Sequence, residues 1–273
     1  MTDTLTKDIE LNDGRAMPRL GLGVWQTPAG EAARIMREAI AAGYRAVDTA
    51  SAYNNEEGVG EGLADSDVFL TTKLWNADQG FDSTLRAFEA SAGRLKRESV
   101  DLYLIHWPAP KKGLFVDTWR ALVRLREEGR ARSIGVSNFT ADHLERVIGE
   151  TGVTPAVNQI ELHPQFQQRA LRAVHDRLGI RTESWSPLGR GRFLGEPALA
   201  AVAEKHGRTP AQVVIRWHLD EGLIVIPKTV NPERLRENIA VWDFALDADD
   251  CARIAELDSP DGRTGPDPLT ATF

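Results

Sequence analysis

The sequence contains a single cysteine among its 273 residues, so an internal disulfide is excluded. This residue, Cys251, falls in a helical pattern, and we expect a buried structural thiol rather than a reactive one. No apolar run reaches the roughly 18–20 residues that a membrane span requires. Residues 1–18 also lack the apolar centre of a signal peptide, which favours a cytoplasmic location.

Positive charge is in deficit, with 33 basic against 40 acidic side chains and a net charge of −7. This balance argues against nucleic acid or an anionic membrane as the main partner. No dinucleotide fingerprint of the Rossmann kind is present, because the glycines of residues 58–62 and 189–195 have the wrong spacing. We expect no metal site, because the following histidines are scattered without ligand spacing: His163, His175, His206 and His218.

Strand-like and helical segments alternate from residue 19 to residue 241. Helical periodicity occurs at residues 31–43, 83–95, 117–129, 142–150 and 232–241. The strand-like segments between them are residues 19–25, 45–50, 68–74, 101–107, 132–138, 155–162, 181–188 and 223–229. The composition does not change along the chain, which predicts an α/β fold of one domain over residues 1–273, a (β/α)8 TIM barrel.

Additional segments are expected around this barrel. Asn12, Asp13 and Gly14 form a hairpin signal, and we expect this N-terminal hairpin to plug one end of the barrel. Extra C-terminal helices are expected at residues 197–207, 209–222 and 247–258. The tail, residues 262–273, is rich in glycine and proline and should lie over the barrel as a loop.

Asp48, Tyr53, Lys73 and His106 each lie where a predicted strand ends and a loop begins, which is where barrel active sites are built. A tyrosine hydroxyl, with an ordinary pKa near ~10, acts as a general acid only when it is made more acidic. A neighbouring lysine ammonium does this by favouring the phenolate, and a carboxylate such as Asp48 keeps the ammonium charged. These residue types predict protonation of a substrate oxygen, the task of a carbonyl reductase.

Other polar and aromatic residues share these strand ends: Trp25, Trp75, Trp107, Ser137, Asn138, Gln159, Trp185 and Lys228. Taken singly, each is more often a packing residue or a solvated charge. Only their occurrence together at the same end of the barrel predicts a site. Lys228 also stands near a helix start that could bind a phosphate. A plain helix cap, Asn231 followed by Pro232, explains that start equally well.

Seven motifs, in order along the chain, carry a resemblance to a known family: GLGVWQ (21–26), VDTASAYNNEEGVGEGL (47–63), TTKLW (71–75), DLYLIHWP (101–108), IGVSNF (134–139), NQIELHP (158–164) and IPKTVNPERLREN (226–238). Through them the sequence resembles the aldo-keto reductases along almost its whole length. It looks most like bacterial members such as the 2,5-diketo-D-gluconic acid reductases. The resemblance implies that aldehydes and ketones are reduced to alcohols by hydride transfer from NADPH, with a small carbonyl compound as substrate.

The resemblance also implies roles for individual residues. Tyr53 would donate a proton to the carbonyl oxygen, Lys73 and Asp48 would tune Tyr53, and His106 would orient the carbonyl or relay the proton. Trp185 falls where an aromatic ring, often tyrosine, stacks on the nicotinamide. The positions that match contacts to the nicotinamide carboxamide are Ser137, Asn138 and Gln159.

The implied cofactor site extends beyond the nicotinamide. Lys228, Thr229 and Arg234 match contacts to the 2′-phosphate, which favours NADPH over NADH because two cations would otherwise lack their dianion. The other implied cofactor-binding residues are Ser186, Leu188, Gly189, Val230, Glu237 and Asn238. The implied walls of an apolar, open substrate pocket are Trp25, Trp75, Trp107 and Phe115.

Two connections are shorter than the family pattern. Residues 63–67 replace a longer helix-to-strand connection on the face opposite the active site, so we expect an effect on stability and intact catalysis. Residues 108–115 also form a short loop, which leaves the substrate pocket open and predicts broad use of aldehydes and ketones. The covered barrel edges suggest a monomer.

Two other functions are compatible with parts of the pattern. Lys73 could form a Schiff base as in a barrel aldolase, but Asp48 would hold it charged and unreactive. The barrel could instead bind NADPH without turnover, as a redox sensor or docking module. A pure binder has no need for Tyr53 and Lys73 together, and tight NADPH binding without turnover would favour it.

Overall fold

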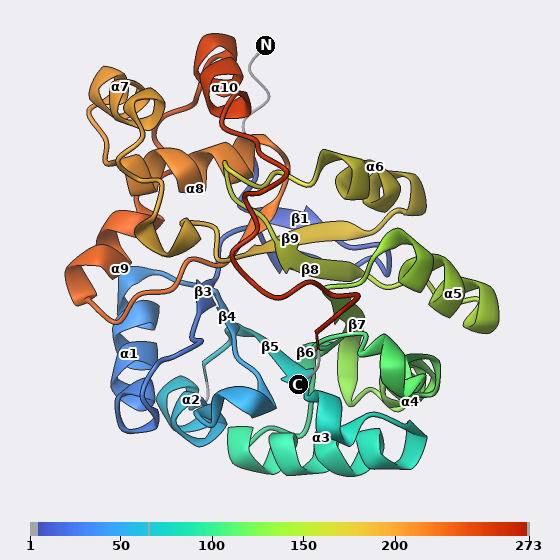
Figure 1. Ribbon diagram of the computed structural model, residues 1–273. Coiled ribbons are helices and arrows are strands. Elements are labelled where there is room, and N and C mark those ends of the chain that lie inside the picture. The colour runs from blue at the N-terminus through green and yellow to red at the C-terminus, as the bar shows by residue number, and fades with distance from the viewer. Residues whose placement is uncertain (1–4, 65, 272–273) are drawn as a thin grey trace.

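A computed structural model describes residues 5–64 and 66–271. Its central sheet contains parallel strands that neighbour one another in chain order: β3 (Leu22–Gly23), β4 (Ala46–Asp48), β5 (Phe69–Leu74), β6 (Val100–Ile105), β7 (Ala131–Ser137), β8 (Val157–Glu161), β9 (Arg181–Trp185) and β10 (Ile224–Val225). Parallel bridges from Leu20 to Val225 and from Gly23 to Lys228 join the last strand to the first. The sheet therefore closes into the predicted barrel (Figure 1).

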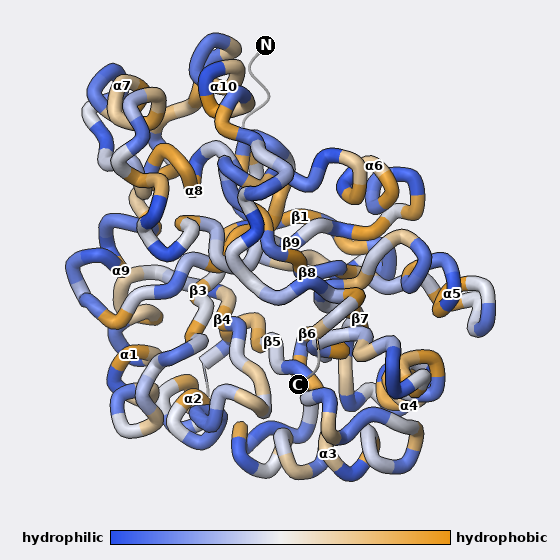
Figure 2. Tube along the Cα trace, viewed as in Figure 1, coloured by the Kyte–Doolittle hydropathy of each residue, from blue (hydrophilic) through white to orange (hydrophobic). Residues whose placement is uncertain are grey.

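Helices surround the barrel: α1 (Ala29–Ala42), α2 (Glu56–Leu63), α3 (Phe81–Leu95), α4 (Phe115–Glu127), α5 (Ala141–Thr151), α6 (Arg169–Leu178), α7 (Pro197–His206), α8 (Pro210–Asp220), α9 (Pro232–Ile239) and α10 (Ala248–Ala255). Short 3-10 turns are η1 (Ser51–Tyr53), η2 (Asn76–Asp78), η3 (Pro110–Lys112) and η4 (Gly189–Gly191). The predicted helices, including the three extra C-terminal ones, are confirmed. Figure 2 shows hydrophilic residues on the outer sides of the helices, and hydrophobic residues along parts of the strands.

Two helices, α2 and α6, lie outside the predicted helical segments, and three of the eight residues of α2 are glycine. These glycines let α2 lie directly on its neighbours. A Cβ on Gly60 would come within 2.4 Å of the Leu95 carbonyl oxygen of α3, and one on Gly62 within 2.5 Å of the Ala33 carbonyl oxygen of α1. Tertiary packing thus overrides a weak local helix propensity. The connection after α2 runs from Leu63 to Phe69, and Asp65 within it lies outside the described residues.

The N-terminal hairpin consists of β1 (Asp8–Glu10) and β2 (Ala16–Pro18), paired antiparallel. Its apolar side chains, Ile9, Leu11 and Met17, are buried against Leu102 and Leu104 of β6. The amino end of the barrel is therefore covered by the hairpin, as predicted.

The remaining expectations concern isolated features. Cys251 lies on α10 and is half-buried, so the expected full burial of this thiol is not found. Across residues 5–64 and 66–271, no helix is long and apolar enough to cross a membrane. In the same residues, no group of three or more His, Cys, Asp or Glu side chains is placed to hold a metal ion.

Candidate active site

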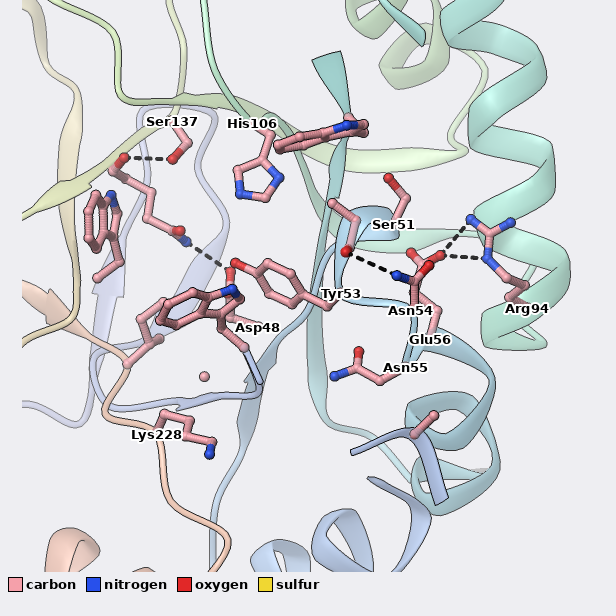
Figure 3. Close-up of a pocket in the computed structure, with 18 of the residues that line it drawn as sticks. Asp48, Ser51, Tyr53, Asn54, Asn55, Glu56, Arg94, His106, Ser137 and Lys228 are labelled. Atoms are coloured by element: carbon pink, nitrogen blue, oxygen red, sulfur yellow. Dashed lines mark hydrogen bonds and ion pairs between the residues drawn. The ribbon is translucent and has the colours of Figure 1, made fainter. Parts of the chain in front are cut away.

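A cavity of about 1510 Å³ extends from the carboxyl ends of the strands to residues of α2 and α3. Parallel strands deliver their terminal side chains to one edge, which explains why residues far apart in sequence meet there. Of the predicted site residues, those lining the cavity are Trp25, Asp48, Tyr53, Trp75, His106, Trp107, Ser137, Asn138, Gln159, Trp185, Ser186 and Lys228. Figure 3 shows Tyr53 and His106 pointing into one space, with Lys228 at a distance from them.

Lys73 lies behind the cavity wall and is completely buried. Its Nζ donates to Oδ1 of Asp48 over 2.5 Å, to the Thr49 carbonyl oxygen over 2.9 Å and to Oη of Tyr53 over 3.4 Å. An ammonium has three N–H groups, so this geometry uses all of them. Although burial favours the neutral amine, Asp48 and Tyr53 hold the pKa of Lys73 above its ordinary value of 10.5. The side chain is therefore a fixed cation.

Tyr53 stands on η1 with its hydroxyl between Lys73 and the cavity. Burial raises the pKa of Tyr53 above its ordinary value of 10.0, and the nearby Lys73 ammonium opposes that rise. The expectation that lysine makes this tyrosine more acidic is thus met only as a partial compensation for burial. At neutral pH the hydroxyl keeps its proton, which is the state that a general acid requires.

His106 follows β6, and its ring meets the ring of Tyr53 edge-on with centroids 5.6 Å apart. Burial, helped by the charge of Lys73, lowers the pKa of His106 well below 6.5. Its Nδ1 is buried without a hydrogen-bond partner among the described residues. A neutral imidazole beside the tyrosine hydroxyl can hydrogen-bond a carbonyl oxygen but carries no charge of its own.

A hydrogen-bonded chain continues from Asp48 to the cofactor side of the cavity. Nε2 of Gln159 donates to Oδ2 of Asp48 and to Oε2 of Glu183, each over 2.8 Å. The backbone carbonyl oxygen of Gln159 accepts a hydrogen bond from the hydroxyl of Ser137, and Nδ2 of Asn138 donates to that hydroxyl. Four strands thus contribute to one connected polar layer across the barrel.

The predicted phosphate site lies at the start of α9. Oδ1 of Asn231 accepts hydrogen bonds from the backbone N–H groups of Glu233 and Arg234, so the helix cap is present. Lys228 and Arg234 are exposed, and neither has an ion pair within the described part of the chain. Two unpaired cations beside a helix N-terminus fit the charge of a phosphate group. Because the cap occupies the N–H groups of Glu233 and Arg234, a phosphate at this helix start would have to be held by the side chains of Lys228 and Arg234.

Some predicted cofactor residues stand away from the cavity. Leu188 and Val230 pack on core clusters, and Thr229 is buried with its hydroxyl accepting the Asn231 N–H. Glu237 accepts a hydrogen bond from the hydroxyl of Thr209 over 2.6 Å. The predicted cofactor-binding residues that do not line the cavity are Leu188, Gly189, Thr229, Val230, Arg234, Glu237 and Asn238.

Phe115 is a correction to the predicted substrate pocket. It is the first residue of α4 and is 2% exposed, with its ring edge-on to Phe139 and His143. Because α4 starts at this residue, the side chain turns into the layer between helix and sheet rather than into the cavity. Trp25, by contrast, is 39% exposed at the cavity edge and lies under the guanidinium of Arg190 at 4.8 Å.

The chain matches the aldo/keto reductase family over residues 19–259. It belongs to that family. An aldo-keto reductase of Mycolicibacterium smegmatis is 56% identical over 97% of this chain and 98% of that protein. Methylglyoxal reductase DkgA of Salmonella typhimurium is 51% identical over 95% and 96%. Gox0644, solved in its apo form and as a mutant in complex with NADPH, is 61% identical with a TM-score of 0.96, covering 97% of this chain and 98% of that one.

Three residues at or beside this site were not predicted from the sequence: Glu183, Glu161 and Pro266. Glu183 could have been noticed as an acidic residue in the middle of a predicted strand. Glu161, at the end of β8, accepts hydrogen bonds from the backbone of Thr264 and Gly265. This contact fastens the tail over the barrel, as expected, in its described part (residues 262–271), and Pro266 lies in the cavity lining. Only the folded chain reveals that pairing.

Proposed function

We propose that this aldo-keto reductase uses NADPH to reduce small aldehydes and α-ketoaldehydes, with methylglyoxal as a substrate. The substrate is suggested by the relatives named methylglyoxal reductase. The cofactor is supported by Gox0644, whose mutant was solved with NADPH, and by the unpaired cations Lys228 and Arg234. The observation that carries the chemistry is the arrangement of Asp48, Lys73, Tyr53 and His106.

The residues of the site supply the proton and the orientation. The cofactor, when bound, supplies hydride to the carbonyl carbon. Tyr53 then donates its proton to the carbonyl oxygen, and Lys73 stabilises the phenolate that is left. His106, being neutral, holds the carbonyl oxygen by a hydrogen bond. The walls formed by Trp25, Trp75 and Trp107 give an apolar pocket that suits small carbonyl compounds.

The roles of the cofactor-binding side chains form part of the same proposal. Ser137, Asn138 and Gln159 hold the carboxamide, and the Trp185 ring stacks on the nicotinamide. Lys228 and Arg234 bind the 2′-phosphate. We also propose a single domain that acts as a monomer, since the closed barrel presents no free sheet edge in its described part. Its location in the cytoplasm stays a prediction.

The geometry does not favour either a Schiff-base aldolase or a non-catalytic NADPH-binding barrel. A Schiff-base role for Lys73 needs a neutral amine, whereas its three hydrogen bonds and raised pKa hold the ammonium. A non-catalytic binder has no use for the proton donor and its cation, which lie together here.

The decisive experiment follows NADPH oxidation with methylglyoxal, other aldehydes and keto acids, in the wild type and in Tyr53→Phe. We expect turnover in the wild type and a fall of about 10²–10⁴-fold in kcat in the variant, with the Kd of NADPH unchanged. Turnover that survives the loss of the hydroxyl would contradict the role of Tyr53. NADPH binding without turnover in the wild type would return the sensor function to consideration.

A further inference from the structure

Glu183 is a buried acid for which the reaction described above has no use. It lies in the middle of β9, where it pairs with Gln159 of β8 and Ile224 of β10, and its side chain has no solvent exposure. Oε2 accepts the hydrogen bond from Gln159, while Oε1 has no hydrogen-bond partner among the described residues. Burying a carboxyl group is costly, so its place beside the catalytic layer calls for a role.

The geometry of Gln159 indicates that role. Its amide nitrogen carries two N–H groups, and the carboxyl oxygens of Asp48 and Glu183 accept one each at 2.8 Å. Within the described residues nothing donates to its Oε1, and Gln159 lines the cavity. The two acceptors therefore fix which end of the amide faces the barrel wall, and leave Oε1 as a free acceptor for a ligand.

The charge balance around Glu183 suits a neutral carboxyl. The titratable groups that face it are Asp48 on β4, Lys73 on β5 and Tyr53 on η1, while β10 presents Ile224. Asp48 already neutralises Lys73. Burial, with the added repulsion of Asp48, raises the pKa of Glu183 to about 8. A proton on the unpartnered Oε1 leaves Oε2 free to accept from Gln159.

We propose that Glu183 is a positioning residue: it holds the Gln159 amide so that Oε1 accepts an N–H of the cofactor carboxamide. This inference rests on the proposed function, in which Gln159 contacts that carboxamide. Asp48 alone engages only one N–H of Gln159, so it leaves the amide free to turn about that bond. Glu183 supplies the second contact and so fixes the orientation of the amide, which Asp48, the acid that holds Lys73, contacts through the other N–H.

The test compares two dinucleotides that differ at one group. NADP+ carries the carboxamide, whereas its 3-acetylpyridine analogue has a methyl ketone there and no N–H to donate. The Kd of each is measured by titration with the wild type, Glu183→Leu, Glu183→Asp and Glu183→Gln. The wild type should prefer NADP+ by about ten-fold, the effect of one well-placed hydrogen bond. Thermal unfolding of each variant establishes that it is folded.

Glu183→Leu keeps a side chain of similar volume but removes the oxygen that accepts the hydrogen bond from Gln159. This variant should lose the preference for NADP+ over the analogue, mostly because it binds NADP+ more weakly. Glu183→Gln keeps a carbonyl oxygen for Gln159 and should retain it. If the leucine variant does not fold, Glu183→Asp carries the test, because its shorter side chain withdraws the acceptor. The proposal is overturned if both Glu183→Leu and Glu183→Asp keep the wild-type preference for NADP+ over the analogue. It is also overturned if Glu183→Gln loses that preference completely.

A failure of the role proposed for Glu183 can be distinguished from a failure of the proposed function. A wild type that binds both dinucleotides equally would show that Gln159 does not receive the carboxamide, which removes that part of the proposed function and this inference with it. A wild type with the preference, unaffected by the Leu and Asp variants, overturns the role of Glu183 alone. Turnover with NADPH is measured separately and does not depend on either result.

Discussion

The indole nitrogen of Trp185 donates a hydrogen bond to Oδ1 of Asn138 over 2.9 Å. Asn138 has a positive φ of 63°, and its Nδ2 donates to the His106 carbonyl oxygen over 3.0 Å. The amide of Asn138 is thus held at both ends, between the ring proposed to stack on the nicotinamide and the backbone of His106, directly after β6. A tyrosine in place of Trp185 would lack a donor at this position of the ring.

Replacing this donor should weaken cofactor binding. Trp185→Phe keeps an aromatic face but loses the N–H, so Asn138 loses one anchor. We expect the Kd of NADPH to rise about three- to ten-fold, the effect of one hydrogen bond, with a smaller change in kcat. Fluorescence titration measures the Kd of NADPH, and steady-state kinetics measure kcat. Trp242→Phe, at a partly buried site outside the cavity, is the matched control, and an equal change in both variants would refute the argument.

The buried pair of Lys73 and Asp48 should dominate the response of stability to mutation. Lys73→Met leaves the Asp48 carboxylate buried without its cation, which costs about 3–5 kcal/mol of unfolding free energy. Adding Asp48→Asn removes the stranded charge, so the double variant should regain part of that loss. Denaturant unfolding of the wild type and the three variants measures this. A double variant whose loss is the sum of the single losses would contradict the pairing.

Glu183 predicts a specific pH dependence of stability. Its pKa is about 8 in the folded protein against an ordinary value of 4.5. Between these values the folded chain holds a proton that the unfolded chain has released, so this group lowers stability as pH rises from 4.5 to 8, and adds no further loss above. The slope approaches about 1.4 kcal/mol per pH unit.

Glu183→Gln removes that contribution. The unfolding free energy of the variant, relative to the wild type, should rise with pH through this window and level off above pH 8. Urea unfolding at several pH values measures both proteins. Parallel curves across the window would show that Glu183 is ionised in the folded state.

The cations at the start of α9 should set the cofactor preference. Lys228→Ala with Arg234→Ala removes both positive charges proposed to meet the 2′-phosphate, so kcat/KM with NADPH should fall by about 10²-fold while that with NADH changes little. Arg236→Ala, on the same helix and also exposed, is the control for a general loss of charge. A preference for NADPH that persists in the double variant would place the 2′-phosphate elsewhere.

The sequence predicted the parts of the structure that depend on local order. Alternating segments predicted the barrel, and strand ends predicted which side chains meet, since Asp48, Lys73 and His106 stand at one edge of parallel strands. Phe115 could not be placed in this way, because its direction depends on where α4 begins. The contact between Glu161 and Thr264 spans 103 residues and leaves no periodic signal. Likewise, α2 is held by glycine contacts that only its neighbours explain.

The closure between β3 and β10 has a consequence for folding and ligand binding. Leu20 meets Val225 and Gly23 meets Lys228 through bridges between segments that stand some two hundred residues apart in the chain. Contacts so distant in sequence carry a large loop-closure entropy, so this junction is expected to be the last to form and the first to open. Lys228 belongs both to this junction and to the proposed phosphate site. A dinucleotide bound there would hold the two ends of the sheet together and slow the opening of the barrel.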